Sequence, residues 1–249
     1  MRFCMGPERF YCEQIDQPAL VELAPEECHH LLSVRRVKPG HSVELFDGRG
    51  GLGTGALHQV RGGTAVVKID QFDRFEPPKA RIVLAVSVPK AKRFDDIVLK
   101  CTEIGINHII PVLFERTVKQ PGNPEKAVLR WRKLIIEAAK QSRRLFLPQL
   151  DEPCQLPDAL SALKNKYPRA RLLAGSPKAQ QNLFEELKTE LQDTIVFIGP
   201  EGGFSPNEEN FLTAQNLRYV KLTNTILRVE TAAIAFASVL AHHRDSKLL

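Results

Sequence analysis

The sequence is poor in cysteine and in aromatic residues, and it contains no long apolar run. Its five cysteines are scattered at positions 4, 12, 28, 101 and 154, and no two of them have a C-x-x-C spacing. An odd number of separated thiols argues against a disulfide framework and indicates reduced cysteines. No segment approaches the roughly 20 apolar residues of a membrane span, and the first residues lack the apolar centre of a signal peptide. We therefore expect a cytoplasmic protein with no membrane partner.

Common metal and phosphate motifs are also missing. The seven histidines include no H-E-x-x-H spacing, so we assign none of them to a metal. Neither G-x-x-x-x-G-K-[ST] nor G-x-G-x-x-G occurs, which disfavours an enzyme that holds a nucleotide by its phosphates. No internal repeat or low-complexity tract interrupts the chain.

Positive charge is present but unevenly distributed. Residues 1–74 carry 9 Lys+Arg and 10 Asp+Glu, whereas residues 79–147 carry 15 Lys+Arg and 6 Asp+Glu. A concentrated basic stretch is typical of a nucleic-acid-binding surface. The alternative interpretation is an ordinary solvated helix face, which is the more common role of charge runs.

The pattern of apolar residues divides the 249-residue chain into two predicted domains. Residues 1–74 are β-rich, with strands at 42–46 and 64–69 and one short helix at 25–32. Consecutive prolines at 77 and 78 resist both helix and sheet, and they mark the linker. Residues 75–249 alternate short apolar strands with helical periodicity, which predicts an α/β domain with a mostly parallel sheet.

The most informative segment follows an apolar strand predicted at 194–198. The sequence Gly199-Pro200-Glu201-Gly202-Gly203 leads into a helix that starts with a capping box, Ser205 and Glu208. A strand, a glycine-rich loop and a helix let backbone N–H groups approach a ligand closely. Because an acidic side chain in the loop repels phosphate, we expect a neutral or cationic ligand there.

Several motifs, in order, extend this signal over nearly the whole chain. They are IGPEGGFS (198–205), ILRVETAA (226–233), HHLLSVRR (29–36), KCTEIG (100–105), ERT (115–117) and EAAKQS (137–142). Together they resemble the bacterial 16S ribosomal RNA uracil-N3 methyltransferases of the SPOUT superfamily. The segment Leu222-Thr223-Asn224-Thr225 departs from that pattern, since it lacks the glycine and basic residue common in the family.

The resemblance implies a fold and a cofactor. The fold is a PUA-like β-barrel that binds RNA, residues 1–74, followed by an α/β SPOUT methyltransferase domain, residues 75–249, with a parallel sheet and a C-terminal trefoil knot. The cofactor is S-adenosyl-L-methionine, held by three loops. The implied cofactor-binding residues are Leu173, Ala174, Ile198, Gly199, Pro200, Glu201, Gly202, Gly203, Leu222, Asn224, Ile226, Leu227 and Arg228.

The resemblance also implies a reaction and its partners. The enzyme would methylate N3 of a uridine in 16S rRNA or the small ribosomal subunit, and it would be a homodimer. Arg228 would stabilise the uracil anion. Glu201, Glu230 or a water molecule would accept the N3 proton, and the sequence leaves this choice open. Glu230 has an equally simple interpretation as a structural ion pair at the start of the last helix.

The predicted RNA contacts are the basic residues of the matching motifs and of the basic stretch. They are Arg35, Arg36, Lys90, Lys92, Arg93, Lys100, Arg116, Lys140, Arg143 and Arg144. Two other functions stay open at this point. One is a SPOUT methyltransferase that modifies another rRNA or tRNA base, and the other is a non-catalytic RNA-binding ribosome assembly factor.

Overall fold

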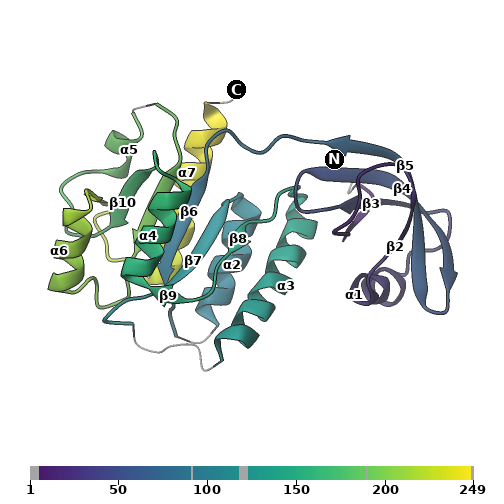
Figure 1. Ribbon diagram of the computed structural model, residues 1–249, viewed down its shortest axis with the longest axis horizontal. Coiled ribbons are helices and arrows are strands. Elements are labelled where there is room, and N and C mark those ends of the chain that lie inside the picture. Colours follow the sequence, from purple (N-terminus) through teal and green to yellow (C-terminus); the bar gives the residue numbers. More distant parts are fainter. Residues whose placement is uncertain (1–5, 91, 118–122, 189, 248–249) are drawn as a thin grey trace. The chain divides into compact units, whose positions relative to one another are not determined.

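A computed structural model of the chain describes residues 6–90, 92–117, 123–188 and 190–247 (Figure 1). The chain divides into two compact units. The first consists of Met1–Pro77 together with Ala139–Leu147, and the second consists of Pro78–Ala138 together with Pro148–Leu249. The division at the two prolines falls in the predicted linker. The segment 139–147 joins the first unit although it lies far along the sequence.

The first unit is built on one five-stranded sheet. Its strands are β1 (Glu8–Tyr11), β2 (Leu20–Glu22), β3 (Ser42–Phe46), β4 (Gly51–Arg61) and β5 (Thr64–Arg74), in the spatial order β1-β3-β4-β5-β2. Neighbouring strands are antiparallel except β1 and β3, which are parallel. A short helix, α1 (Pro25–His29), continues into a π-helical turn, η1 (His30–Val34).

An apolar core lies against the sheet of this unit. Alternate residues of the strands, such as Val43, Leu45 and Val67, are fully buried and pack with Leu31 of η1. Residues two apart in a strand point to the same face, so Val43 and Leu45 share the side of β3 that faces this core. The strand predicted at 42–46 is therefore confirmed, and the one predicted from residue 64 extends to Arg74.

The second unit contains a parallel sheet in the order β12-β10-β11-β6-β7-β8, with β9 pairing to β7. The strands are β6 (Ile82–Ser87), β7 (His108–Leu113), β8 (Gln149–Leu150), β9 (Cys154–Gln155), β10 (Arg171–Gly175), β11 (Thr194–Ile198) and β12 (Arg218–Val220). Every strand pair in it is parallel. The predicted α/β class is confirmed. The knot that the resemblance implies stays a prediction.

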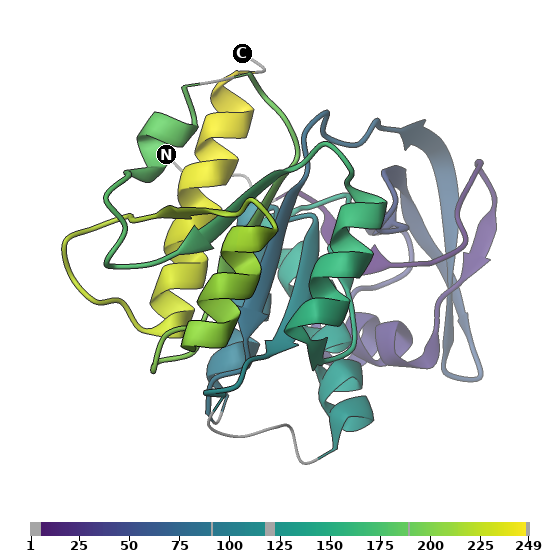
Figure 2. The ribbon, with the colours of Figure 1, turned by 60° about the vertical axis from the view of Figure 1, so that its left-hand side comes forward.

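Helices cover both faces of this sheet. They are α2 (Arg93–Ile104), α3 (Pro124–Ser142), α4 (Leu156–Lys166), α5 (Leu183–Glu186), α6 (Pro206–Ala214) and α7 (Val229–Ser246). Helices α4 and α6 pack over one face and share a core with Val83 and Phe197 (Figure 2). Helices α2 and α7 pack on each other, and α7 packs against β6. None of the helices within the described ranges is long and apolar enough to cross a membrane.

Local interactions fix the ends of α2 and α3 and their contact with each other. Asn123 caps α3, because its side-chain oxygen accepts a hydrogen bond from the Lys126 N–H at 2.9 Å. Gly105 ends α2 in the left-handed conformation, with φ +95°, where glycine carries no steric cost. Trp131 of α3 stacks on Phe94 of α2 with ring centroids 4.4 Å apart, and its indole N–H donates to Asp95.

Candidate functional site

A cavity of about 280 Å³ lies in the second unit, at the carboxyl ends of three adjacent strands. In the register of the sheet, Gly175 at the end of β10 is opposite both Ile198 of β11 and Val220 of β12. Because parallel strands end at the same edge, the loops that follow these three strands converge there. The three loops predicted to surround a cofactor therefore meet in space.

Nine of the predicted cofactor residues line this cavity. They are Ile198, Gly199, Pro200, Glu201, Gly202, Gly203, Leu222, Ile226 and Leu227. Leu173 and Ala174 do not line it, because they belong to β10 itself and are fully buried in the sheet. Asn224 and Arg228 also lie outside its lining, and both are exposed.

The glycine loop, residues 199–203, is held by an arginine from another segment. Arg116, which follows β7, donates from Nη1 to the carbonyl oxygens of Gly202 at 2.8 Å and Phe204 at 3.1 Å. Gly203 has φ +70°, and its N–H donates to the Pro200 carbonyl at 2.8 Å to close the turn. Arg116 lines the cavity and holds this loop in place. The sequence predicted Arg116 as an RNA contact and did not suggest this role.

The loop is also fixed at its downstream end, by the predicted capping box. The Ser205 hydroxyl accepts from the Glu208 N–H at 3.2 Å, and Glu208 Oε2 accepts from the Ser205 N–H at 2.8 Å. The other carboxylate oxygen of Glu208 accepts from the Glu115 N–H at 2.8 Å. One buried carboxylate therefore ties the start of α6 to the segment that carries Arg116.

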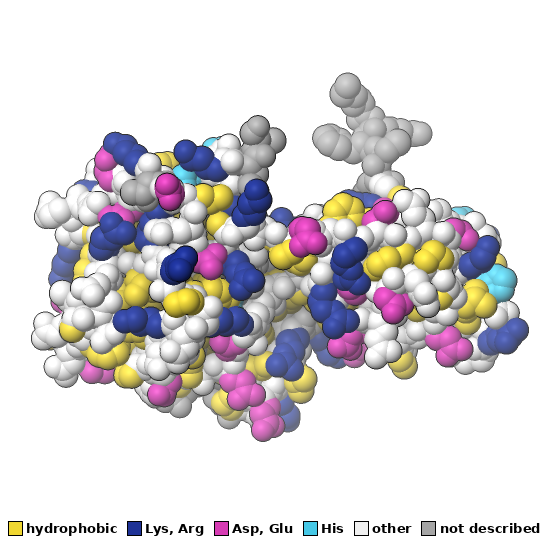
Figure 3. Space-filling model, turned by 45° about the horizontal axis from the view of Figure 1, so that its top comes forward, with side chains coloured by type: hydrophobic (Ala, Val, Ile, Leu, Met, Phe, Trp, Pro, Cys, Tyr) yellow, Lys and Arg dark blue, Asp and Glu magenta, His cyan; other side chains and the backbone are white. Residues whose placement is uncertain are grey.

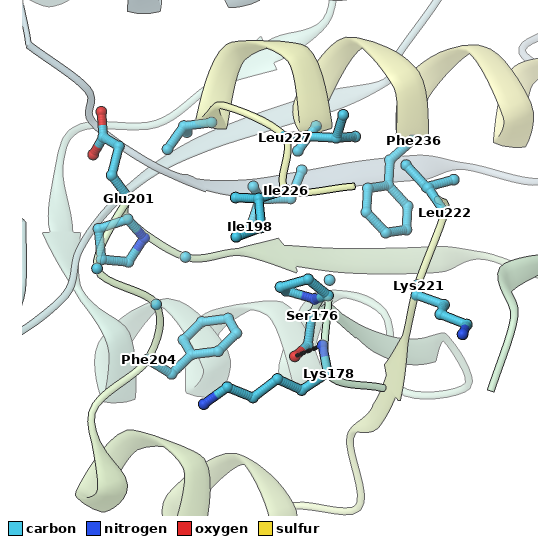
Figure 4. A pocket seen from close by; sticks show the side chains of 18 of the residues that line it. Ser176, Lys178, Ile198, Glu201, Phe204, Lys221, Leu222, Ile226, Leu227 and Phe236 are labelled. Carbon is cyan, nitrogen blue, oxygen red and sulfur yellow. Dashed lines mark hydrogen bonds between the residues drawn. The ribbon is translucent and has the colours of Figure 1, made fainter. Parts of the chain in front are cut away.

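Apolar side chains form the inner part of the cavity (Figure 4). Ile198, Leu222, Leu227 and Phe236 lie around it, with Phe236 reaching in from α7. A Cβ on Gly175 would come within 2.8 Å of the Phe236 ring, so glycine is needed where β10 meets α7. Phe236 was not predicted, although it lies four residues after Ala232, which also lines the cavity, on the same face of α7.

Charged residues among those that line the cavity are exposed, such as Lys178 and Glu209. Lys178, which was not predicted, extends along it from the loop after β10, and Ser176 lies beside it (Figure 4). Glu209 of α6 lines the cavity as well, and its carbonyl accepts a hydrogen bond from the Tyr219 hydroxyl at 3.2 Å. Burial raises the pKa of Tyr219, so this hydroxyl stays protonated and keeps donating.

Two of the predicted catalytic residues lie close to one predicted RNA contact. The Arg93 guanidinium is 3.5 Å from a carboxylate oxygen of Glu201 and 3.7 Å from one of Glu230. Glu201 lines the cavity, whereas Glu230 does not. On α7 the cavity is lined by Val229, Ala232 and Phe236, so Glu230 faces another side of the helix.

The other predicted RNA contacts have varied surroundings. Arg36, Lys90 and Lys92 are exposed. Arg35 pairs with Glu8 at 3.2 Å, and Lys100 pairs with Glu103 at 3.0 Å. On the face seen in Figure 3, Lys and Arg side chains are interspersed with Asp and Glu.

Three predicted RNA contacts lie in the last turn of α3 or just after it, within the first unit. The Lys140 side chain is only 5% exposed, and its ammonium lies 2.9 Å from a carboxylate oxygen of Glu27. Arg143 pairs with Glu44 at 2.6 Å, and Arg144 is half-buried. Lys140 therefore offers no exposed charge to a phosphate.

The chemistry of the cavity suits a nucleoside that carries a charged tail. Apolar side chains and glycine backbone surround its inner part, while Glu201, Glu209 and Lys178 offer charges of both signs near its opening. An amino-acid group with one ammonium and one carboxylate matches such a pair of charges. In the part of the chain that the structure describes, no group of three His, Cys, Asp or Glu side chains is arranged to hold a metal ion.

Comparisons with known proteins find similarity over most of the chain. A family model of the RNA methyltransferase domain matches residues 76–241, and one of the RNA methyltransferase PUA domain matches residues 23–70. Ribosomal RNA small subunit methyltransferase E of Synechocystis sp. is 31% identical over 237 residues, which cover 91% of this chain and 74% of that protein. The protein of the same name from Mesomycoplasma hyopneumoniae is 35% identical over 67% of this chain and 71% of its own length.

Solved structures show the same similarity. A ribosomal RNA small subunit methyltransferase E of Neisseria gonorrhoeae, bound to S-adenosylmethionine, has a TM-score of 0.84 and 29% identity, with 95% of this chain and 97% of that chain covered. A putative methyltransferase of Legionella pneumophila, in complex with the same cofactor, has a TM-score of 0.85 and 28% identity over the same shares. The predicted order of the domains, PUA-like first and methyltransferase second, is confirmed.

Proposed function

Because this chain belongs to the ribosomal RNA small subunit methyltransferase E family, we propose that it methylates N3 of a uridine in 16S rRNA with S-adenosylmethionine as methyl donor. The observation that carries the proposal is the cavity where the three loops converge. The cavity is lined by the backbone of the glycine loop and by Glu201. The lining carries charges of both signs, with Glu201 and Glu209 beside Lys178 and Lys221. Such a lining suits a cofactor that has a positive sulfonium and an amino-acid end with one ammonium and one carboxylate group.

The cofactor would be held by its two chemically different ends. Its nucleoside fits among Ile198, Leu222, Leu227 and Phe236, where apolar contact and backbone groups are available. Its amino-acid end fits near the opening, where Lys178 can pair with a carboxylate and Glu209 with an ammonium group. When bound, the cofactor supplies a methyl group activated by a positive sulfur.

The chain's own residues would prepare the base. Methylation at N3 forms an N–C bond and releases the N3 proton, so negative charge develops on the uracil ring. Arg228 is the exposed N-cap of α7, between Leu227 and Val229, which both line the cavity. From there its guanidinium can stabilise the charge on the uracil oxygens. Glu201 lies at the same opening and can take the proton.

RNA binding would use the basic residues that remain accessible. Arg36, Lys90 and Lys92 are exposed, and Arg35 has a side chain 47% exposed beside Glu8. We propose these four as phosphate contacts to the small-subunit RNA, with the cytoplasm as the place of reaction. Each contact should contribute about 0.7 to 0.9 to the slope of log affinity against log salt concentration.

A homodimer is part of the same proposal. Ile226 lines the cavity yet is 85% exposed, which is unusual for a large apolar side chain. Ala233, Ala237 and Ala241 are buried within the chain, so the small residues of α7 are largely used for internal packing. A second copy that covers Ile226 would complete the wall of the cavity. Sedimentation equilibrium should give twice the mass of the chain, and Ile226→Asp should shift it to the monomer.

A methylation assay tests the central proposal. The protein is incubated with the cofactor and with small subunits from cells that lack this modification, and the nucleosides are then analysed by mass spectrometry. We expect N3-methyluridine in 16S rRNA. A methyl group on another nucleoside would refute the N3 assignment. If no methyl group is transferred to subunits, to free 16S rRNA or to tRNA, the chain is a binding protein.

A further inference from the structure

One arginine connects the cavity to the start of the last helix. Arg93 is the first residue of α2, and its guanidinium lies between carboxylates from two other elements. Nη1 is 3.5 Å from Glu201 in the glycine loop, and Nε is 3.7 Å from Glu230 in the first turn of α7. Three segments that are distant in sequence therefore meet at a single side chain.

The two carboxylates differ in their exposure to water. The Glu230 side chain is 16% exposed, and its Oε2 atom is buried with no hydrogen-bond partner in the described part of the chain. The Glu201 side chain is 37% exposed and lines the cavity. A buried carboxylate requires a nearby cation, because the charge has lost its hydration. Glu230 thus anchors Arg93 from the inner side.

The charges around Arg93 argue against a direct contact with RNA. Two carboxylates lie within 4 Å of one guanidinium, so the group of three carries a net negative charge. Such a group repels a phosphate, whereas Lys90 and Lys92 on the preceding segment are exposed. Arg93 is therefore not expected to contact RNA phosphate, although it lies next to those lysines in the sequence.

The side chain of Glu201 is directed by this contact. In Figure 4 its carboxylate points away from Ile198, Leu222 and Phe236, which surround the inner cavity. Its backbone lies in the loop that Arg116 braces through the Gly202 carbonyl. The backbone of the loop is therefore held by Arg116, while the carboxylate that the loop carries forms a 3.5 Å ion pair with a different arginine, Arg93.

We propose that Arg93 is a positioning residue, anchored by Glu230, that holds the Glu201 carboxylate at the opening of the cavity to receive the N3 proton. The proton moves from N3 to a Glu201 oxygen, directly or through one water, while the electron pair of the N–H bond stays on the uracil. Glu230 then acts only through Arg93. This inference rests on the proposed uridine methylation, and it selects Glu201 among the acceptors that the sequence left open.

Mutational coupling between these residues tests the proposal. We expect Arg93→Ala to lower the single-turnover rate about 100-fold at saturating substrate, since a misplaced group costs about that much. Glu201→Ala should cost at least as much, and the double variant should be no slower than Glu201→Ala alone. Arg93→Lys, which keeps the charge but not the fork of donors, should be intermediate. Glu230→Gln should reproduce part of the loss.

Two further measurements separate positioning from RNA binding and from misfolding. The slope of RNA affinity against salt should be the same for Arg93→Ala and the wild type, whereas a lost phosphate contact would lower it by about 0.7 to 0.9. Arg130→Ala is the matched control, because Arg130 pairs with Asp95 in the first turn of α2, 2.8 Å away, and does not line the cavity. It should leave the rate unchanged.

The outcomes are distinct from those of the proposed function. If the wild type forms no N3-methyluridine, the proposed function fails before any variant is compared. If the wild type is active and Arg93→Ala and Arg93→Lys both keep full rates, only the positioning role is refuted. Losses that multiply in the double variant, or a lowered salt slope, would also refute it.

Discussion

Arg116 and Gly202 are joined by a 2.8 Å hydrogen bond from the guanidinium to the glycine carbonyl, and the same Nη1 atom reaches Phe204 at 3.1 Å. The contact crosses 86 residues of sequence. It shows that the cavity loop is shaped by a side chain from the neighbouring β7 segment as well as by its own glycines.

Replacement of Arg116 should therefore weaken the cofactor site. We expect Arg116→Ala to lower the affinity for S-adenosylmethionine several-fold, because the glycine loop loses two donors and gains freedom. Arg116→Lys should recover only part of the loss, since an ammonium on a flexible stem does not keep the planar geometry in which Nη1 reaches both carbonyls. Calorimetric titration gives the affinity. An unchanged affinity combined with a lower salt slope for RNA would instead support the original prediction of a phosphate contact.

Two substitutions of Gly202, one small and one large, test whether the cofactor binds in the cavity. A Cβ at this position would lie 3.4 Å from Arg116 Cδ, which is ordinary contact. Gly202→Ala should bind the cofactor nearly as well as the wild type. Gly202→Trp should abolish binding, because the ring fills the cavity, while the unfolding temperature changes by only a few degrees. Equal affinities for the two variants would place the cofactor elsewhere.

Arg228 should matter for the reaction and not for the cofactor. It is exposed and outside the cavity lining, so Arg228→Ala should leave cofactor affinity and unfolding temperature unchanged. Methyl transfer should fall by about 100-fold or more if the guanidinium stabilises the developing charge. Arg169→Ala, at an exposed site that does not line the cavity, is the control. Normal turnover of the Arg228 variant would end its catalytic assignment.

Lys140 should contribute to stability. Its ammonium is 2.9 Å from Glu27, and both side chains are at most 10% exposed. Lys140→Met leaves the carboxylate buried and uncompensated, which typically costs about 3–5 kcal/mol of unfolding free energy. The double variant Lys140→Met, Glu27→Gln should regain much of the lost unfolding free energy, because it no longer buries an unpaired charge. Urea unfolding measures both effects, and a loss of RNA affinity with no change in stability would contradict the structural role.

Local chemistry made part of the fold predictable. The capping box of Ser205 and Glu208 involves neighbours in sequence, so residue types and spacing were sufficient to predict it. Strand β4 was missed because it begins Gly51-Leu52-Gly53-Thr54-Gly55, and glycine is depleted in strands. Its neighbours require that glycine: a Cβ at Gly55 would meet the Lys68 carbonyl at 1.9 Å.

The sequence predicted those parts of the cavity that are formed by loops directly after strands. The sequence identified the glycine loop and the 222–227 segment, and both line the cavity. It did not identify Lys178 or Phe236, because their proximity to that loop depends on which strands are neighbours in the sheet. The partners of Arg93, Arg116 and Lys140 are likewise distant in sequence, so their charges alone suggested RNA contacts.

The first unit is formed by two separate segments of the sequence. This limits where the protein can be truncated and where its gene can recombine. Residues 139–147 belong to it, and they bring the partners of Glu27 and Glu44, which are Lys140 and Arg143. A fragment that stops at the paired prolines would keep both carboxylates and lose both cations. Recombination at that linker would transfer the first unit without residues 139–147. A functional exchange therefore has to include the coding sequence for both segments of this unit.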